Sequence, residues 1–328
     1  MVEPRYTFTV FTATFNRAHT LSRVYEALKG QTFRDFEWLI VDDGSTDGTG
    51  ELVAGWLHES DFPIRYVWQP RGGKARATNR GVEGARGRFF LPLDSDDVGL
   101  PQALERFKHY WDSIPEGERH LYSAVTCLMQ DESGKICGNP FPFPVVDSDS
   151  LEMRDRYQST GERWGFHRTD VLRQFPFPEI DGETFITEGV VWTRIALSFK
   201  TRYVNDVLGV YFRESDSIRG TGARVKNPRG AALYYRQLAN TNYPLSNRFR
   251  LRSYVNYVRY SFHAKVGAGV QLREVRSAIR WWLALPVGVL LVLRDRVLGM
   301  LTPAQAALGS SGPAAPTRGS PASELDRS

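Results

Sequence analysis

The chain has 328 residues, of which 41% are hydrophobic and 24% are charged, so it can bury a sizeable core. Its 42 basic and 37 acidic residues give a net charge of +5, and much of the basic excess follows residue 217. The near balance of the first half argues against a general nucleic-acid surface, whereas a basic C-terminal region suits an anionic membrane or a phosphate-bearing substrate. Cys127 and Cys137 have neither CxxC spacing nor a histidine partner, which argues against a zinc site or a disulfide framework.

Strands and helices are predicted to alternate through the first hundred residues. Apolar spacing places strands at residues 6–11, 36–41, 64–68 and 89–93, with amphipathic helices between them at 20–30, 51–59 and 75–85. This order predicts an α/β fold with a mostly parallel sheet flanked by helices. Ligands of such sheets bind beyond the carboxyl ends of the strands. Because a strand begins at residue 6, we expect no signal peptide.

The rest of the chain is predicted to be mixed at first and then helical. We expect a helix around 104–111, a hairpin over 122–137, a helix over 189–199 and short strands at 201–204 and 207–212. Helical patterns continue from about residue 231 to 298, and the Ala-, Pro-, Gly- and Ser-rich residues after Thr302 predict disorder. We therefore expect a domain over residues 1–225, a helical extension over 226–302 and a disordered tail over 303–328.

One apolar run lies in the predicted helical extension. Residues 281–293 carry no charge, and Pro286 interrupts them. The run is too short to span a bilayer as a helix. Two interpretations stay open, a buried core helix and an interfacial segment, because Arg280, Arg294 and Arg296 flank the run as interfacial anchors would.

A cluster of aspartates follows the last predicted strand of the first hundred residues. Asp94, Asp96 and Asp97 come directly after the apolar run at residues 88–93. Carboxylates this close repel one another and resist burial unless a cation joins them. Hard divalent ions such as Mg²⁺ or Mn²⁺ prefer oxygen ligands of this kind and commonly bridge a diphosphate. A solvated Asp-rich turn is the alternative.

Six segments together carry a resemblance to a known family. They are FTATFNR (11–17), QTFRDFE (31–37), VDDGSTD (41–47), GK (73–74) with NRG (79–81), LDSDD (93–97), and TE (187–188) before WTRIA (192–196). Their order and spacing over about residues 5–215 resemble the family 2 glycosyltransferases, which have the nucleotide-sugar-binding GT-A fold. The resemblance implies a GT-A domain over residues 1–225.

The resemblance also implies a nucleotide site and a metal site. Phe15 and Asn16 would border the nucleobase, and Asp43 would hydrogen-bond it, which suits uracil. Asp94 and Asp96 would hold Mg²⁺ or Mn²⁺. The full implied nucleotide-binding set is Thr14, Phe15, Asn16, Asp43, Lys74, Asn79, Asp94 and Ser95. From the residues alone, Asp43 also fits a capped turn that starts a helix, and Lys74 fits a surface lysine.

Glu188 is the implied catalytic base. Family members usually place an Asp after a Glu at this point, whereas this chain has Thr187, Glu188 and Gly189. An acid at a helix N-terminus also has an ordinary stabilising role, so that alternative stays open. Resemblance further implies that the loop at residues 213–219 closes over the donor. Trp164 and His167 lie where family acceptors bind, although core packing explains a tryptophan equally well.

The predicted function is an inverting, metal-dependent transfer of a sugar from a nucleoside-diphosphate donor, with UDP favoured, to a hydroxyl acceptor. The expected partners are that donor and a saccharide or lipid-linked saccharide, with no nucleic acid, in polysaccharide or glycolipid biosynthesis of the cell envelope. We expect a cytoplasmic location, with peripheral contact at the inner face of the membrane. Two alternatives remain: a sugar-nucleotide nucleotidyltransferase, which would usually show a Gly-rich basic loop after the first strand, and a non-catalytic module that binds nucleotide sugars or acts as a scaffold.

Overall fold

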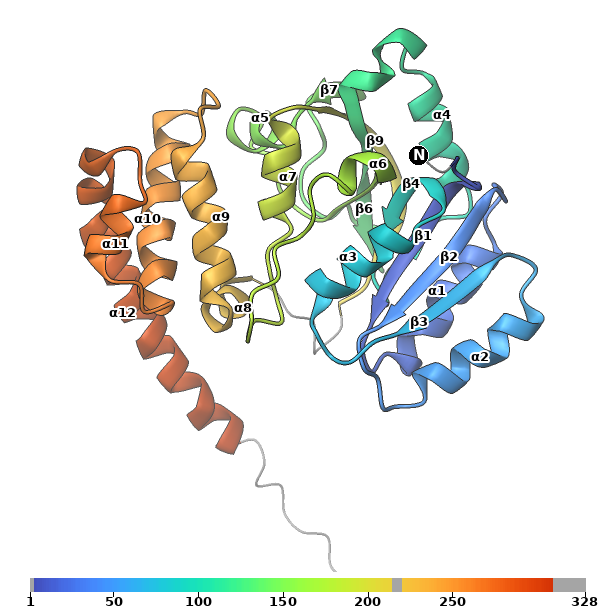
Figure 1. The fold of residues 1–328 in the computed structure, drawn as a ribbon, viewed down its shortest axis with the longest axis horizontal. Helices are drawn as coiled ribbons and strands as arrows, with labels where there is room; N and C mark the ends of the chain where they lie inside the picture. The colour runs from blue at the N-terminus through green and yellow to red at the C-terminus, as the bar shows by residue number, and fades with distance from the viewer. Residues whose placement is uncertain (1–2, 214–219, 309–328) are drawn as a thin grey trace, which may run out of the picture.

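The computed structural model describes residues 3–213 and 220–308 (Figure 1). Nine strands form one sheet in the order β3-β2-β1-β4-β8-β6-β9-β5, with β7 paired to β9. They are β1 (Tyr6–Thr14), β2 (Phe36–Asp42), β3 (Ile64–Trp68), β4 (Gly87–Pro92), β5 (Val98–Gly99), β6 (Tyr122–Asp131), β7 (Val145–Ser148), β8 (Arg163–Arg168) and β9 (Lys200–Tyr211). The first four strands pair in parallel, as β6 and β9 do, while β8, β5 and β7 run antiparallel to their neighbours.

Helices cover both faces of the sheet and then continue as a separate bundle on one side of it (Figure 1). Those of the sheet domain are α1 (Ala18–Lys29), α2 (Thr49–Glu59), α3 (Lys74–Gly84), α4 (Ala103–Asp112), a 3-10 turn (Glu116–Leu121), α5 (Ser150–Asp155), α6 (Thr169–Leu172) and α7 (Gly189–Ala196). Those that follow are α8 (Gly220–Lys226), α9 (Pro228–Asn240), α10 (Asn247–His263), α11 (Ala268–Arg273) and α12 (Ala278–Leu308). The predicted fold class is confirmed.

Alternate residues of the central strands enter two different cores. Phe8, Val10 and Trp38 pack on one face, with apolar side chains of α1, α2 and α4. Phe11 and Val41 pack on the opposite face, with those of α3, α6 and α7. Because successive side chains of a strand point to opposite faces, a near-continuous apolar run is what a sheet covered on both sides requires. This double cover leaves the strand ends as the places where polar groups can gather.

Two local predictions differ from the structure. The predicted hairpin over 122–137 turns at residues 131–135 as expected, but after the long strand β6 its returning arm is short and forms one antiparallel bridge, between Gln130 and Ile136. After this bridge the chain turns toward residue 160 instead of continuing beside β6, and Thr160 N–H donates to Asn139 Oδ1 (2.7 Å). The two short strands predicted at 201–204 and 207–212 are one strand, β9, because shifts of register against β6 absorb the polar residues between them.

The C-terminal helices pack against one another in sequence. Trp281 and Ala284 of α12 are buried against Tyr254, Tyr257 and Val258 of α10. Among the described residues, no helix has the length and apolar character needed to cross a membrane. The predicted tail is helical as far as Leu308, and its remainder lies outside the described residues.

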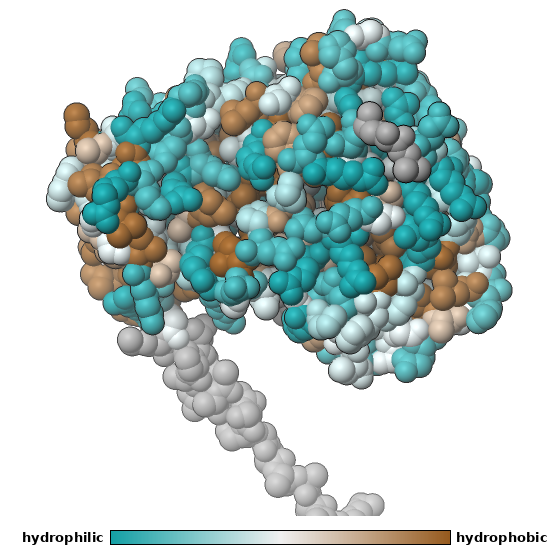
Figure 2. All heavy atoms as spheres, in the orientation of Figure 1, coloured by the Kyte–Doolittle hydropathy of each residue, from teal (hydrophilic) through white to brown (hydrophobic). Residues whose placement is uncertain are grey.

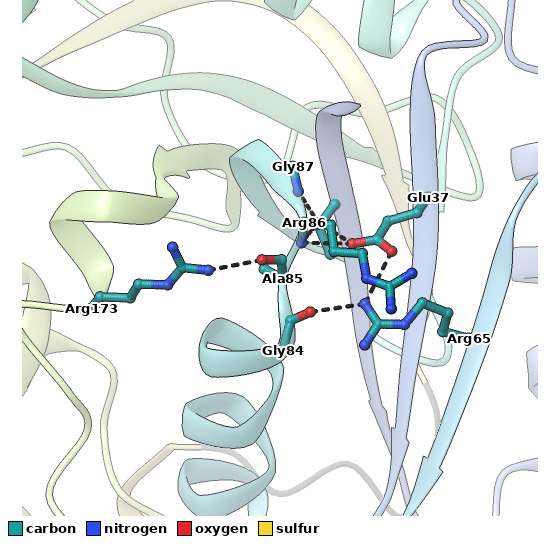
Figure 3. A network of polar contacts seen from close by, with 8 residues as sticks. Glu37, Arg65, Gly84, Ala85, Arg86, Gly87 and Arg173 are labelled. Carbon is teal, nitrogen blue, oxygen red and sulfur yellow. Dashed lines mark hydrogen bonds and ion pairs between the residues drawn. The ribbon is translucent and has the colours of Figure 1, made fainter. Parts of the chain in front are cut away.

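A buried glutamate ties three parallel strands together at the edge of the sheet opposite their carboxyl ends (Figure 3). Glu37 on β2 is fully buried and accepts hydrogen bonds from Thr9 Oγ1 (2.7 Å) and from the backbone N–H of Arg86 (2.8 Å). Arg65 on β3 lies 3.1 Å from its second oxygen and also donates to the carbonyl of Gly84 (2.8 Å). The start of β4 is thereby held in register with its neighbours.

We expect Glu37→Ala to lower the free energy of unfolding by about 3 kcal/mol, because it removes the acceptor of the Arg65 guanidinium, of the buried Thr9 hydroxyl and of the Arg86 N–H. Urea unfolding of the purified protein measures this loss. Glu59→Ala, at an exposed position of α2, is the control and should stay within about 0.5 kcal/mol of the unmodified protein. Equal midpoints for the two variants would show that the network contributes no net stability.

Candidate active site

The segments that follow β1 and β2 lock together at the carboxyl edge of the sheet. Asn16 has φ of 53°, a left-handed conformation that asparagine tolerates better than most residues. In this conformation its N–H donates to Ser45 Oγ and its Oδ1 accepts from the N–H of Thr46, both at 2.8 Å. The carbonyl of Thr14 accepts from the N–H of Asp43 (2.8 Å), and the buried Thr14 Oγ1 has no hydrogen-bond partner among the described residues.

Asp42 and Asp43 have different surroundings although they are adjacent. Asp42 accepts from the N–H of Ser45 (2.7 Å) and from the hydroxyl of Tyr66 (2.6 Å), which holds the turn after β2. Burial and the hydrogen bond to Asp42 raise the pKa of Tyr66 above its usual range. Asp43 instead accepts from Gln69 Nε2 and from the backbone N–H groups that follow Arg71, each at 2.8 Å. Asp43 therefore fixes the loop that leads to Lys74.

Phe15 lies at the mouth of this region, half-buried. The guanidinium carbon of Arg71 is 3.2 Å from the centroid of its ring, a cation–π contact. The guanidinium therefore covers one face of the Phe15 ring and forms a stacked pair with it. A flat aromatic base has the shape to extend such a stack.

The aspartate cluster forms one group of oxygens. One carboxylate oxygen from each of Asp94, Asp96 and Asp97 lies within 4.8 Å of the others. Burial first, and then the charge of Asp94, raises the pKa of Asp96, and the same two causes raise the pKa of Asp97 to about 8. These residues fit a hard divalent cation, because a bound cation would offset the repulsion that crowding and burial cause. Ser95, between them, is buried.

Asp97 also links the aspartate cluster to the end of β9. Its Oδ1 accepts from the backbone N–H of Phe212 (3.0 Å), just past the end of β9. The ring of Phe212 carries the guanidinium of Arg23, 3.9 Å from its centroid, and Arg23 also donates to the carbonyl of Asp96 (3.1 Å). The cluster is therefore joined to the segment that leads into the predicted closing loop, of which residues 214–219 lie outside the described residues.

Lys74 connects the aspartate cluster to the predicted base. Its ammonium lies 2.8 Å from Asp94 Oδ1 and 3.2 Å from Glu188 Oε1. Burial disfavours the charged lysine, but the two carboxylates outweigh this cost and raise the pKa of Lys74 above its usual range. The side chains of Asp94 and Glu188 are 50% and 47% exposed, so both carboxylates can be reached from solvent. Together with Trp192 and Phe177, these three residues line a small hollow.

Glu188 stands at the N-cap of α7, and the helix after it packs closely on α9. A Cβ atom at Gly189 would lie 2.7 Å from the ring of Tyr234, which is buried in α9. Only glycine fits there without displacing one of the two helices. The close approach of α9 thus explains why a glycine follows Glu188.

The segment before Glu188 is also held by the C-terminal helices. Both oxygens of Glu183 accept from the first N–H groups of α9, at Arg229 (2.6 Å) and Gly230 (2.7 Å). This segment and the loop containing Gly73 enclose a cavity of about 260 Å³ next to Lys74. At Gly73 (φ 88°) a Cβ atom would lie 2.8 Å from the carbonyl of Thr184, so the two walls touch beside the cavity.

The structure brings most of the predicted residues together, with one exception. Asp43 fixes the loop that carries Lys74, and Lys74 contacts both Asp94 and Glu188. Asn79 differs, because its amide is engaged with the backbone of Phe177 (2.8 and 2.9 Å) and with Glu179. Its assignment to the nucleotide stays a prediction, as the roles of the other site residues do.

Trp164 and His167 are built into the core. Trp164 is buried, and its Nε1 donates to the carbonyl of Pro92 (2.6 Å). His167 stacks on Trp192 with ring centroids 4.3 Å apart and an interplanar angle of 5°. Burial lowers the pKa of His167 to about 3, so its imidazole is neutral at physiological pH. In this structure Trp192, rather than Trp164, is the aromatic side chain that lines the hollow at Glu188.

Gln69 and Arg71 are site residues that sequence reasoning missed. Both follow β3, and they contact Asp43 and Phe15, two residues of the predicted nucleotide site. The rule that polar residues after parallel strands converge would have included them, had it been applied to the third strand as it was to the first, second and fourth.

Comparisons with known proteins agree with this arrangement. The family model described as "Glycosyl transferase family 2" matches residues 9–118. "Glycosyltransferase GlyG" of Streptococcus pneumoniae is 27% identical over 222 residues, which is 63% of this chain and 71% of that protein. A protein of Campylobacter jejuni named GalNAc(5)-diNAcBac-PP-undecaprenol beta-1,3-glucosyltransferase is 27% identical over 259 residues, 76% of this chain and 77% of its own length.

Solved structures share the fold at lower identity. S. aureus TarS 1-349 in complex with UDP superposes with a TM-score of 0.59 at 19% identity, covering 86% of this chain and 80% of that one. A mannosyltransferase from Pyrobaculum calidifontis, in complex with GDP-Man and Mn²⁺, gives 0.54 at 19% identity, with coverage of 90% and 88%. At this identity the likeness extends to the fold alone.

Proposed function

This chain belongs to the glycosyl transferase family 2, and from that premise we propose that it moves a sugar from a UDP donor to a hydroxyl acceptor with inversion, in a reaction that depends on a divalent metal. It is a glycosyltransferase that uses a nucleotide-sugar donor. The main observation in support of this mechanism is the position of the Lys74 ammonium, which lies 2.8 Å from Asp94 and 3.2 Å from Glu188. It brings the proposed base and the proposed diphosphate site into one hollow.

Glu188 acts as the general base in this proposal. Its carboxylate takes the proton of the acceptor hydroxyl, and the oxygen of that hydroxyl attacks the anomeric carbon of the donor sugar. The bond from this carbon to the β-phosphate oxygen breaks on the opposite side, so one displacement inverts the configuration and releases the nucleoside diphosphate. The 47% exposure of the Glu188 side chain supports the role, because the acceptor must reach it.

The remaining residues bind and orient the donor. Asp94 and Asp96 would hold Mg²⁺ or Mn²⁺, which when bound offsets the negative charge of the diphosphate. Lys74 binds the same phosphates as a cation, and it stays protonated because its two carboxylate neighbours raise its pKa. Phe15 with Arg71 stacks on the uracil. Asp43, with Thr14 and Asn16 beside it, faces the polar edge of the base.

The acceptor is proposed to be a lipid-linked saccharide of the cell envelope. The relative from Campylobacter jejuni has an undecaprenol-linked saccharide in its name, and TarS structures exist with UDP and with UDP-GlcNAc. The cavity of about 260 Å³ between residues 71–76 and 179–186 is lined by charged residues, among them Arg71, Asp181 and the Arg76–Glu179 ion pair (2.9 Å), which suits a polar saccharide. Such an acceptor would place the protein at the cytoplasmic face of the membrane.

A panel of nucleotide sugars tests the proposal. The purified protein is incubated with each donor and Mn²⁺, and the released nucleotide is separated by chromatography. Free UDP from a UDP-sugar, abolished by EDTA and restored by Mn²⁺ or Mg²⁺, is the expected result. Release of pyrophosphate from UTP and a sugar phosphate would favour a nucleotidyltransferase instead, and binding without turnover of any donor would favour a non-catalytic module.

A further inference from the structure

We propose that the exposed side of α12 is a docking surface for an anionic lipid bilayer. We call this surface the α12 face and define it by six apolar residues. Their exposures are 76% for Ile279, 57% for Trp282, 63% for Leu283, 64% for Leu290, 51% for Leu293 and 57% for Val297. Figure 2, in which hydrophobic residues are brown, shows such surface at the end of the molecule where Figure 1 places α11 and α12.

The α12 face is not the side that packs on the protein. Trp281, Ala284 and Val292 are buried, and they recur at the spacing of one helix face. The six exposed residues lie on the opposite face, from Ile279 to Val297, which is 19 residues or about 27 Å of helix. A contiguous apolar surface of this length on a folded protein marks an interaction site more often than a chance exposure.

Charge identifies the partner. Between residues 220 and 299 the chain has fourteen arginines and lysines but only two acids, Glu274 and Asp295. Both acids are already paired: Asp295 is buried and contacts Arg259 (2.5 Å), and Glu274 contacts Arg236 (2.5 Å). Arg229 also lies 3.7 Å from Glu183, outside this range, and the rest of the basic excess suits the phosphate groups of anionic lipids. A second copy of the chain is a less suitable partner, because its own α12 face would carry the same positive charge and repel the first.

The basic residues near the α12 face are placed as anchors at an interface. Arg294 and Arg296 are exposed beside its C-terminal end, and Arg280 lies beside its start. The long side chain of arginine can keep its charge at the level of the lipid phosphates while apolar neighbours enter the acyl region. Apolar residues along the centre of the exposed helix side, with arginines at its margins, match this mode of binding.

A chain of helix contacts joins the α12 face to the proposed base. Trp281 of α12 packs on Tyr254 of α10, and Tyr235 of α9 stacks on Tyr260 of α10 with centroids 5.5 Å apart. Tyr234 of α9 in turn meets Gly189, next to Glu188. A bilayer bound at α12 would thus be held at a set distance from the site. The idea that the bilayer is held at a set distance from the site rests on the proposed function, whereas the binding of α12 to a bilayer does not.

Sedimentation of the full-length protein with lipid vesicles tests the inference. We expect binding to phosphatidylcholine vesicles that contain phosphatidylglycerol, weaker binding to phosphatidylcholine alone, and a loss of binding as salt rises. The double variant Leu283→Asp with Leu290→Asp should lower the partition coefficient on both kinds of vesicle at least about tenfold, because two charges replace apolar side chains. Arg280→Glu with Arg296→Glu should lower it about tenfold on anionic vesicles only.

Leu57→Asp is the matched control, since Leu57 is a 48% exposed leucine on α2, far from α12 in the fold. It should bind vesicles as the unmodified protein does, and circular dichroism should show all variants folded. Unmodified protein that stays in the supernatant, or leucine variants that bind normally, would overturn the inference. So would a dimer in light scattering that the leucine variants dissociate. Vesicle binding by a protein that turns over no donor would refute the proposed function and leave this inference standing.

Discussion

Glu188→Gln is expected to lower sugar transfer about a thousandfold while the protein still binds its donor. The amide keeps the size of the carboxylate but cannot take a proton from the acceptor. Donor affinity should change little, because the contacts proposed for the nucleotide lie at Phe15, Asp43 and Asp94. Initial rates of transfer and calorimetric titration with the nucleotide sugar measure the two quantities separately.

Glu83→Gln is the control, because Glu83 is an exposed glutamate of α3. It should keep full activity. A Glu188→Gln enzyme with turnover within a factor of three of the unmodified protein would remove Glu188 from the mechanism. Loss of donor binding together with activity would show instead that Glu188 acts through Lys74, which it contacts at 3.2 Å.

Asp96→Asn should lower metal-dependent transfer by roughly a thousandfold, because the proposed metal contributes several kcal/mol to charge stabilisation of the departing diphosphate. A second readout needs no turnover. Mn²⁺ should raise the melting temperature of the unmodified protein, since a ligand that binds only the folded state stabilises it. Asp96→Asn should lose most of this shift.

Asp61→Asn serves as the control for the melting experiment, because Asp61 pairs with Arg34 at an exposed position outside the cluster. It should retain the Mn²⁺ shift. If Asp96→Asn kept both the shift and the rate, the metal would have to bind elsewhere. If it kept the shift but lost the rate, Asp94 and Asp97 would suffice for binding and Asp96 would act only on the reaction.

The strand–helix alternation and the carboxyl-edge site could be predicted because they follow from short-range patterns. Apolar runs bounded by Asp42 and Asp94 predict where the parallel strands end, and parallel strands that neighbour one another bring those ends together. The observed bounds of β2 and β4 differ from the predicted ones by one or two residues. The contact of Lys74 with Asp94 depends on that same convergence.

Other features depend on contacts between distant segments, which no local pattern announces. Gly189 could not be explained from its neighbours in sequence, because the reason for it is Tyr234, 45 residues later. The apolar run at residues 281–293 allowed both a buried and an interfacial helix, and the structure shows that α12 has one buried side and one exposed side. Trp164 was ambiguous for the same reason, since its burial depends on packing against Phe107.

Helix α9 contacts the chain on both sides of Glu188, at Glu183 and at Gly189. These two contacts limit how the protein can be shortened or recombined. Cutting the chain near residue 226 would remove α9. The carboxylate of Glu183 would then lose the N–H donors of Arg229 and Gly230, and the space beside Gly189 that Tyr234 fills would be empty. A hybrid that takes its last helices from a relative would have to take residues 183–189 from the same parent. Swaps that respect this pairing should give soluble enzymes, and swaps that divide it should not.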